Sequence, residues 1–416
     1  MKIKYCTILL TSLLFFRCSK PDNKVSDKDF YRNETKQLID FFEKNAWSNE
    51  LETYYSEIDN EGKVISDKVY TVASSRLIYG LSFASRYNPS YLNKAKAVAT
   101  FQKKHLIGNS KAGYYSHSFV ENQKAGGQNK LDVWQQAYGL CGLSELYRQT
   151  HDLETLPILH QLHKGFITRF RDKEAGGLWG EYNIESGPVS GSKSLQSLMY
   201  PLTAYMINLW EADQENRAFY ENQIKENLDL LYRYGWNSKT EWVNVQLNDD
   251  WTPKVKEDGS MNFSVTVGHN FQLSALLLRA SKFPFLSVEQ KENYERLGQE
   301  IIDITLQKNI FHHGKIQNGF YSEFNPNTSK VLDDRKTWWQ HAEAIIALSL
   351  YEGKYDDERH LFEQYFFNTF ADRKYGGEYF YASKDDQPIT SELKGSIGKS
   401  TYHTIEMIRF LTRDHK

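Results

Sequence analysis

Two histidines stand where predicted apolar helices begin, and both are candidates for acid–base chemistry. Gly268-His269 opens the stretch VGHNFQLSALLLRA, whose apolar residues recur every three or four positions and predict a buried helix. His403 ends KGSIGKSTYH, a glycine- and serine-containing approach to the last predicted helix. A lone histidine on an apolar helix usually packs in a core. Because imidazole titrates near neutrality, two histidines facing one cavity can instead exchange protons with a bound substrate.

Other polar and aromatic residues with chemical potential also lie at or near predicted helix starts. Arg76 lies in VASSRLIYGLS, where an unpaired charge is costly, so we expect it to face a polar cavity. The motifs KTWWQHAEA and LDVWQQAYGL each begin a further predicted helix. Trp134, Trp338, Trp339, His341 and Glu343 of these two motifs are candidate substrate-binding residues.

Two pairs of neighbouring histidines have spacings that also occur in metal sites. His160 and His163 form one pair, and His312 and His313 form the other. Neither pair has a carboxylate cluster beside it, and the HExxH motif is absent from the sequence. We therefore expect solvated positions for these histidines, and we predict neither a metal nor another cofactor.

The composition narrows the class of partner. The chain has 416 residues with 51 Lys and Arg against 53 Asp and Glu, a net charge of -2, so no basic excess indicates a nucleic-acid partner. Aromatic residues make up 14%, with 9 Trp and 27 Tyr. Such rings combine an apolar face with a polar edge and suit the faces of a sugar. We expect most of these rings to pack in the core.

The N-terminus predicts export. Lys2 and Lys4 precede an apolar run at 6–16 that is too short to cross a bilayer as a helix. Cys18 follows this run and is the predicted site of lipid attachment. We expect the protein in the bacterial periplasm or at the outer membrane, held by a lipid. The predicted segments are an export signal at 1–17, a polar tether at 18–29 and one catalytic domain at 30–416.

The remainder of the chain predicts an all-α fold. Apolar residues spaced by three and four predict twelve helices, at 30–44, 71–87, 89–105, 131–148, 153–170, 194–211, 216–234, 268–282, 288–308, 336–351, 356–370 and 399–412. Six short stretches of alternating aromatic and polar residues recur between them, typically after a glycine, as in GGLWGEY and GGEYFY. Six repeats of a helix pair predict a closed (α/α)6 barrel with short β-hairpins or loops at one end. We expect a ligand cavity at the mouth of this barrel.

The motifs WQQAYGL, GGLWGEY, GHNFQLSALLLRA, KTWWQHAEA and KGSIGKSTYH, in this order, resemble the N-acylglucosamine 2-epimerase family. The resemblance covers essentially all of 30–412. The family includes cellobiose and mannobiose 2-epimerases and mannose-type aldose–ketose isomerases, and its members are (α/α)6 barrels. The resemblance implies a sugar isomerase that needs no cofactor.

The resemblance also implies residue roles. It places the family's two catalytic histidines at His269 and His403, and the arginine beside the reacting carbonyl at Arg76. The substrate shell differs from the family pattern at several positions. Gln272 stands where the family usually has a glutamate. The segment 196–200, which ends with Tyr200, aligns with a family segment that contains a histidine, and it has none. His341 replaces a usual glutamine.

The expected chemistry is proton transfer next to a sugar aldehyde. A histidine removes the proton from C2, a cation holds the enediolate, and the proton returns either to C2 or to C1. These outcomes are 2-epimerisation and aldose–ketose isomerisation of a hexose, an N-acylhexosamine or a β-linked disaccharide. Two alternative functions stay open. One is an (α/α)6 glycoside hydrolase or lyase, and the other is a carbohydrate-binding lipoprotein without catalysis. Hydrolysis normally needs a pair of carboxyl groups, and no distinctive pair stands among the candidates Asp132, Glu181, Asp333 and Asp334.

Overall fold

The structure, a computed structural model, describes residues 27–126, 129–351 and 353–413. The predicted export signal and the lipidation site Cys18 lie outside these residues, as does most of the predicted tether. The first described helix begins at Asp27, inside the segment predicted as tether; Asp27 and Asp29 in its first turn favour a helix N-terminus. No helix among the described residues is both long and apolar enough to cross a membrane.

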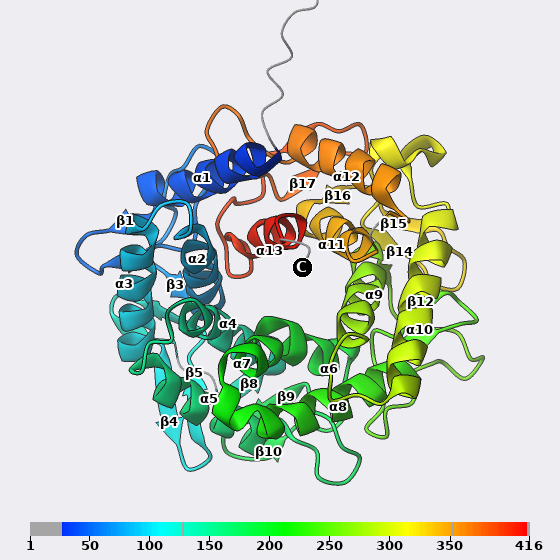
Figure 1. Cartoon of the computed structure of the whole chain (residues 1–416), viewed down its shortest axis with the longest axis horizontal. Helices are drawn as coiled ribbons and strands as arrows, with labels where there is room; N and C mark the ends of the chain where they lie inside the picture. Colours follow the sequence, from blue (N-terminus) through cyan, green and yellow to red (C-terminus); the bar gives the residue numbers. More distant parts are fainter. Residues whose placement is uncertain (1–26, 127–128, 352, 414–416) are drawn as a thin grey trace, which may run out of the picture.

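The helices surround one centre in two layers, which Figure 1 shows from one end. The inner helices are α2 (Thr71–Ala84), α4 (Val133–Thr150), α6 (Leu195–Pro201) with α7 (Ile207–Ala212), α9 (Val267–Ala280), α11 (Trp338–Ser349) and α13 (Tyr402–Leu411). The outer helices are α1 (Asp27–Asn45), α3 (Ser90–His105), α5 (Thr155–Phe170), α8 (Arg217–Tyr234), α10 (Val288–Gln307) and α12 (Asp356–Thr369). Helices are therefore confirmed in all twelve predicted regions.

Burial explains why the helices divide into two layers. Every residue of α2 is buried, because outer helices cover one side of it and its ring neighbours cover the others. In α10 the buried residues Tyr294, Gly298, Ile301, Ile302 and Thr305 form a single stripe, which is typical of a helix with one solvated face. The sequence thus assigns the uniformly apolar helices to the inner layer and the amphipathic ones to the outer layer.

The last inner helix closes the ring against the first. A Cβ at Gly80 of α2 would lie 2.3 Å from the Thr401 hydroxyl, so glycine is what permits this close approach. Thr401 donates from its hydroxyl to the Arg76 carbonyl at 2.6 Å, and Ser400 donates to the Ala73 carbonyl at 3.1 Å. These contacts fix the segment before α13 on the side of α2 that faces the centre.

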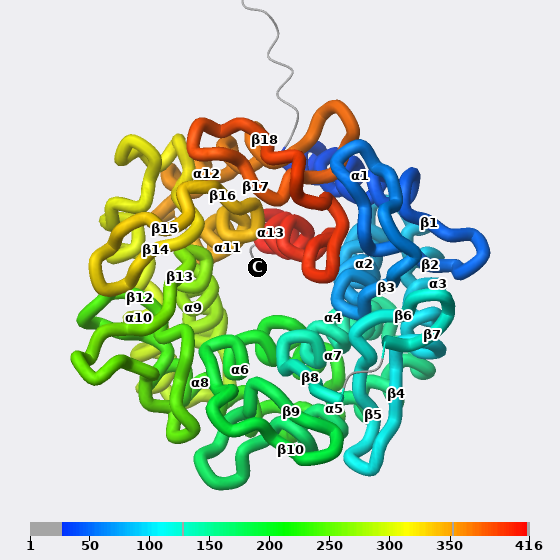
Figure 2. Tube along the Cα trace, turned by 180° about the vertical axis from the view of Figure 1, so that it is seen from behind, coloured from blue at the N-terminus to red at the C-terminus, as the bar shows by residue number. Residues whose placement is uncertain are grey.

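Short antiparallel strands connect neighbouring repeats. Strand β3 (Val69–Tyr70) leads directly into α2 and pairs with β6 (Phe119–Glu121), which precedes α4. The same arrangement recurs before α9 and α11, where β13 (Val265–Thr266) and β16 (Lys336–Thr337) pair with strands of the next repeat. Because these strands lead into inner helices, they lie at the end of the ring where the inner helices begin, which faces the viewer in Figure 2.

The remaining strands complete these small sheets. They are β1 (Trp47–Ser48), β2 (Thr53–Tyr54), β4 (Ile107–Ser110), β5 (Gly113–Ser116), β7 (Lys124–Ala125), β8 (Lys130–Asp132), β9 (Glu181–Asn183), β10 (Gly187–Pro188), β11 (Trp236–Asn237), β12 (Trp242–Val243), β14 (Glu323–Phe324), β15 (Val331–Asp333), β17 (Tyr381–Ala382) and β18 (Pro388–Ile389). Each sheet in the described residues has two or three strands. Strands or turns thus occupy the places where the recurrent aromatic stretches predict hairpins.

Several inner helices begin later than predicted. The helix predicted at 336–351 begins at Trp338, because Lys336 and Thr337 pair with β17. The helix predicted at 399–412 begins at Tyr402, because 398–401 is held against α2.

The helix predicted at 194–211 is interrupted by a π-helical turn, Leu202–Met206, directly after Pro201. Proline lacks the N–H that continues the α-helical pattern, so the irregular turn follows from the sequence.

A buried charge network joins inner helices at the opposite end of the ring. Arg409 contacts Glu406 at 2.9 Å and lies 3.8 Å from Glu145. Glu211 accepts from Arg279 at 2.7 Å and from Arg148 at 3.0 Å. These residues lie on α4, α7, α9 and α13, so the network connects four inner helices. Each charge has a partner of opposite sign, which offsets the cost of burying it.

Replacing Arg409 by methionine is expected to destabilise the fold strongly. The change leaves Glu406 buried beside Tyr79 without its guanidinium partner, and breaking a buried pair in this way costs about 3–5 kcal/mol. Denaturant unfolding measures the loss. The control is Lys282→Met, which removes an exposed partner of Glu295 and is expected to cost less than about 1 kcal/mol. Equal effects of the two changes would contradict a structural role for the network.

Candidate active site

A cavity of about 300 Å³ opens at the centre of the ring, at the end where the inner helices begin. Side chains from α2, α4, α6, α9, α11 and α13 line it together with the segment 396–398. Its lining residues are Arg76, Trp134, Tyr138, Gln196, Tyr200, Gln272, Trp338, Trp339, Phe380, Ser396, Ile397, Gly398 and His403. The wall is mainly aromatic with a few polar groups, an arrangement that suits a sugar.

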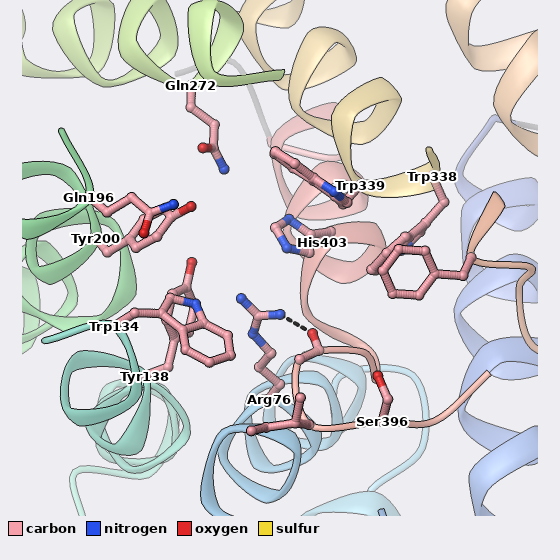
Figure 3. A pocket seen from close by; sticks show the side chains of 13 residues that line it. Arg76, Trp134, Tyr138, Gln196, Tyr200, Gln272, Trp338, Trp339, Ser396 and His403 are labelled. Carbon is pink, nitrogen blue, oxygen red and sulfur yellow. Dashed lines mark hydrogen bonds between the residues drawn. The ribbon is translucent and has the colours of Figure 1, made fainter. Parts of the chain in front are cut away.

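His403 reaches the cavity from the first turn of α13 and is oriented from behind by a carboxylate. Its Nδ1 lies 2.8 Å from Oε1 of Glu343 on α11. The rings of Trp338 and Trp339 pack against the imidazole, with centroids 5.7 and 5.8 Å away. With Nδ1 bound to Glu343, Nε2 is the nitrogen that remains available to a ligand (Figure 3). This is the geometry of a positioned general base.

The electrostatics of this pair favour a neutral imidazole. Burial lowers the pKa of His403 well below its ordinary value, and the nearby charges of Arg76 and Lys399 lower it further. Burial raises the pKa of Glu343 to about 7, although a hydrogen bond from Gln272 and the charge of Arg76 act in the opposite direction. The pair therefore changes its proton content near neutral pH. With Glu343 ionised, the Nδ1–H of His403 donates to the carboxylate and leaves the Nε2 lone pair toward the cavity.

Arg76 supplies the positive charge of the cavity. Its guanidinium lies over the ring of Tyr138, 4.1 Å from the centroid, and 5.2 Å from that of Tyr402. Nη1 donates to the carbonyl of Gly398, which holds the segment 396–398 at the rim (Figure 3). The other side of the guanidinium is directed to the cavity between Tyr138 and His403. A cation in this place can stabilise an oxyanion on a bound sugar.

His269 lies in the first turn of α9 and has hydroxyl groups beside both of its nitrogens. It is not among the residues that line the cavity, although it is 7% exposed. Its Nε2 is 3.2 Å from the Tyr200 hydroxyl, and its Nδ1 is 2.9 Å from the Thr266 hydroxyl. Burial lowers the pKa of His269 to about 4, so the imidazole is neutral at physiological pH. Tyr200, which does line the cavity, places its hydroxyl at Nε2 of this imidazole.

Local capping explains how α6 and α9 present their side chains. Ser194 and Ser197 form a capping box at the start of α6, so the helix begins in a fixed orientation one residue before Gln196. Gln196 and Tyr200 are one helical turn apart and therefore point to the same side. On α9, the N–H of Gly268 donates to Gln340 of α11 at 2.8 Å, which fixes the first turn that carries His269. Gln272 enters the cavity one turn further along α9 (Figure 3).

A buried lysine supports the aromatic wall from outside. Lys399 is 1% exposed, and its Nζ lies 3.8 Å from the ring centroid of Trp338 and 3.9 Å from Oε2 of Glu378. Burial lowers the pKa of Lys399 to about 7, against the effect of Glu378. Phe380 packs on the same indole at 4.6 Å. Lys399 therefore positions Trp338 but does not itself reach the cavity.

Comparison with known proteins identifies the family. The family model described as N-acylglucosamine 2-epimerase (GlcNAc 2-epimerase) matches residues 53–407, most of the chain. The chain belongs to the N-acylglucosamine 2-epimerase family. The cellobiose 2-epimerase of Dictyoglomus turgidum is 23% identical to it over 363 residues, 81% of this chain and 85% of the relative.

Solved structures share the fold. The cellobiose 2-epimerase of Bacillus thermoamylovorans B4167 superposes with a TM-score of 0.78 at 20% identity, over 92% of this chain and 98% of the other. A D-mannose isomerase superposes with a TM-score of 0.77 at 17% identity, over 94% of this chain and 99% of the other. The family and these relatives are epimerases and isomerases, in agreement with an enzyme of the isomerase class.

Most residues that the sequence predicts for this family site do meet at the cavity. Arg76, His403, Trp134, Tyr200, Gln272, Trp338 and Trp339 line it, and Glu343 binds His403 from behind. His269 stands behind Tyr200. The structure brings these residues together, while their roles in catalysis stay predictions.

His341 does not reach the cavity, so its predicted role in substrate binding is wrong. The residue is 0% exposed. Its Nδ1 donates to the Thr337 carbonyl at 2.8 Å, and its Nε2 accepts from the Phe320 N–H at 3.2 Å. Its ring stacks on that of Phe320 with centroids 3.9 Å apart. Both nitrogens are thus satisfied by backbone in the layer between α11 and α12, where a substrate does not reach.

Six lining residues were not predicted as site residues: Tyr138, Gln196, Phe380, Ser396, Ile397 and Gly398. Spacing could have identified two of them. Tyr138 follows Trp134 by four residues on α4, and Gln196 precedes Tyr200 by four on α6, so each shares a helix face with a predicted residue. The other four lie in segments outside the helices, whose side-chain directions carry no such periodicity.

The histidine pairs with metal-like spacing take structural roles. His160 pairs with Asp213 at 2.6 Å, and His163 lies 2.9 Å from the Tyr205 hydroxyl. The second pair, His312 and His313, stacks at the surface. Across the described residues, no group of three or more His, Cys, Asp or Glu side chains is placed to hold a metal ion. His163 is 2% exposed, so the predicted solvated position is wrong for this residue.

Replacing Arg76 by methionine is expected to lower kcat by about 10²–10³-fold, the usual loss when a donor to a developing oxyanion is removed. Methionine keeps most of the aliphatic stem and removes the charged guanidinium that lies over Tyr138. Steady-state kinetics on a reducing sugar measures the effect. Because Arg76 also holds Gly398, thermal unfolding of the same variant shows how much of the loss is structural. Unchanged kcat in a folded variant would exclude the oxyanion role.

Proposed function

We propose that the chain is a sugar isomerase that transfers protons at C1 and C2 of a reducing sugar through an enediolate. The observation that carries this proposal is the His403–Glu343 pair, whose free nitrogen faces the same cavity as Arg76. His403 Nε2 removes the proton from C2, and the electrons of the C2–H bond form the C1–C2 double bond. The negative charge moves to O1, where Arg76 stabilises it.

The proposed substrate is a hexose, an N-acylhexosamine or a β-linked disaccharide. The proteins similar to this chain include a cellobiose 2-epimerase and a D-mannose isomerase, whose names place their reactions at these carbons. The cavity volume of about 300 Å³ accommodates one sugar ring, and the open rim at 396–398 leaves room for a second. In the predicted form of the mechanism, His269 is the second titratable group, and no cofactor takes part.

The glycosidase alternative requires two carboxyl groups across the scissile bond. None of the 13 residues that line the described cavity is Asp or Glu. Asp132 caps α4 through the Gln135 N–H, Glu181 pairs with Lys130 at 2.6 Å, and Asp333 binds Arg335. This distribution supports proton transfer over hydrolysis.

One incubation separates the candidate functions. The protein is mixed with mannose, N-acetylmannosamine, cellobiose or mannobiose in deuterated water, and the products are followed by NMR. The proposal predicts deuterium at C2 or C1 of the recovered sugar. Shortened disaccharides without deuterium would establish a hydrolase, and binding without either change would establish a carbohydrate-binding protein. Either result overturns the proposal.

We also propose, from the N-terminal sequence, that the protein is exported, that 1–17 is removed and that Cys18 carries a lipid. The proposed catalytic domain, an (α/α)6 barrel, then stands on a short tether at a membrane of the bacterial envelope. Mass spectrometry of the protein from its native membrane tests this. A mature chain that retains the first seventeen residues would contradict it.

A further inference from the structure

The two histidines of the site are not equivalent, and the difference has consequences for the reaction. His403 has one nitrogen bound to a carboxylate and the other toward the cavity. His269 has both nitrogens beside hydroxyl groups, those of Tyr200 and Thr266. The ring of Trp339 packs against both imidazoles, with centroids 5.5 and 5.8 Å away. A ligand in the cavity therefore meets the free nitrogen of His403 and the phenol of Tyr200, whose hydroxyl occupies Nε2 of His269.

Tyr200 and His403 enter the cavity from facing sides, with Arg76 below and between them (Figure 3). A sugar held at Arg76 has its carbonyl oxygen near the guanidinium and its carbons toward the two walls. Epimerisation at C2 requires a group on each face that exchanges a proton with carbon. Aldose–ketose isomerisation requires such a group on one face, together with a group that moves a proton between O1 and O2.

A phenol suits the second task. Burial raises the pKa of Tyr200, so the hydroxyl is protonated in the resting site and acts as a donor. An alcohol or enediol oxygen of a sugar exchanges protons readily with such a hydroxyl, whereas carbon does so slowly. Behind the phenol, His269 lies at hydrogen-bond distance and is held by Thr266, so its Nε2–H can stabilise the oxygen of Tyr200 when the proton leaves.

We propose that the site interconverts an aldose and a 2-ketose, with His403 moving a proton between C2 and C1 and the Tyr200 hydroxyl moving a proton between O1 and O2. This inference rests on the proposed function and specifies which of its two outcomes occurs. Tyr200 is the catalytic residue at the oxygens, and His269 is a positioning residue that acts through it.

The steps balance without an oxidant or a reductant. His403 Nε2 takes the proton from C2, the C2–H electrons form the C1–C2 double bond, and O1 receives the proton of Tyr200. The phenolate oxygen then takes the proton from the O2 hydroxyl, and C2–O2 becomes a carbonyl. The C1–C2 electrons take the proton back from His403 at C1. The product is a 2-ketose, and both side chains regain their starting protonation.

The first test uses the unmodified protein and any sugar that it turns over in deuterated water. The expected first product is a 2-ketose with deuterium at C1 where His403 has exchanged its proton with solvent. A first product that is the 2-epimer, with deuterium at C2, would overturn this inference but leave the proposed function intact. Neither a 2-ketose nor a 2-epimer, with no deuterium at either carbon, would remove the proposed function itself, so the two failures are distinguishable.

The second test separates Tyr200 from His269. Tyr200→Phe is expected to lower kcat by about 10²-fold or more, with KM changed much less. The matched control is Tyr205→Phe on the same inner segment. The Tyr205 hydroxyl lies 2.9 Å from Nδ1 of His163, so this change also removes a hydroxyl from a buried Tyr–His pair, but one outside the cavity. The control is expected to keep kcat and to show any loss of thermal stability that belongs to the missing hydroxyl.

Combining changes then shows whether His269 acts through Tyr200. His269→Gln alone is expected to lower kcat, and the double variant with Tyr200→Phe is expected to be no slower than Tyr200→Phe alone, because one proton path is already broken. A further loss of tenfold or more in the double variant would show that His269 acts on the sugar independently. That result would restore a two-histidine mechanism and overturn the inference.

Discussion

His403→Gln is expected to lower kcat for sugar isomerisation by about 10²–10⁴-fold, the usual contribution of a positioned general base. The imidazole is the nitrogen base that faces the cavity, and its Nδ1 is held 2.8 Å from Glu343. Glutamine keeps a hydrogen-bonding group near Glu343 and the packing against the tryptophans, yet it cannot accept a proton from carbon at neutral pH.

The control for this variant is His163→Gln, which changes a buried histidine outside the cavity. Its kcat is expected to stay close to that of the unchanged protein, although its thermal stability falls. Steady-state kinetics and thermal unfolding of both variants give the comparison. Turnover by folded His403→Gln within tenfold of the unchanged protein would exclude His403 as the base.

Glu343→Gln is expected to lower kcat by about 10²-fold or more, because an amide no longer fixes the Nδ1–H tautomer of His403. The pKa of Glu343 is raised to about 7 by burial, so activity that needs the ionised carboxylate rises as the pH passes through this value. The variant is expected to lose this limb of the pH–rate profile. The same limb in the variant would assign it to another group, of which Lys399 is the nearest with a pKa of about 7.

Ionisation of Glu343, which is expected to raise activity, is expected to lower the stability of the folded protein. A carboxyl group with a raised pKa binds its proton more tightly in the folded state, so its contribution is complete below the unfolded pKa of 4.5 and is lost as the pH rises through about 7. The lost contribution is about 3 kcal/mol. Glu343→Gln removes the buried charge, so its stability relative to the unchanged protein is expected to increase with pH over this range. Unfolding at several pH values measures this, and a constant difference would contradict it.

The helical fold was predictable because the physical signal is strong and local. Inner helices such as α9 are dense in apolar residues and almost uniformly buried, outer helices such as α10 carry one buried stripe, and the connections between them repeat. The irregular starts were not predictable in the same way. The pattern of the following residues predicts that Lys336 and Thr337 are helical, but their backbone groups pair with β17 and form a strand. The position of α13 likewise depends on Gly80, which lies 318–321 residues earlier in the chain than the segment 398–401 that it admits.

The site was predictable where a motif fixed both residue type and position. His403, Arg76 and the tryptophan pair meet as the family motifs imply. His341 shares its motif with Trp338 and Trp339, yet its helical position directs it to the layer behind α11. The contact between the Tyr200 hydroxyl and Nε2 of His269 could not be predicted from the sequence, because it depends on how α6 and α9 are placed relative to each other. Contacts of this kind decide which nitrogen meets the substrate.

The most direct test of His403 as the carbon base is the fate of the hydrogen at C2. A sugar labelled with deuterium at C2 is turned over in ordinary water, and the label is followed by NMR. Our account predicts that deuterium leaves C2 during turnover, appears in water or at C1, and stays at C2 with His403→Gln. Turnover of the sugar by the unchanged protein with deuterium fully retained at C2 would contradict it.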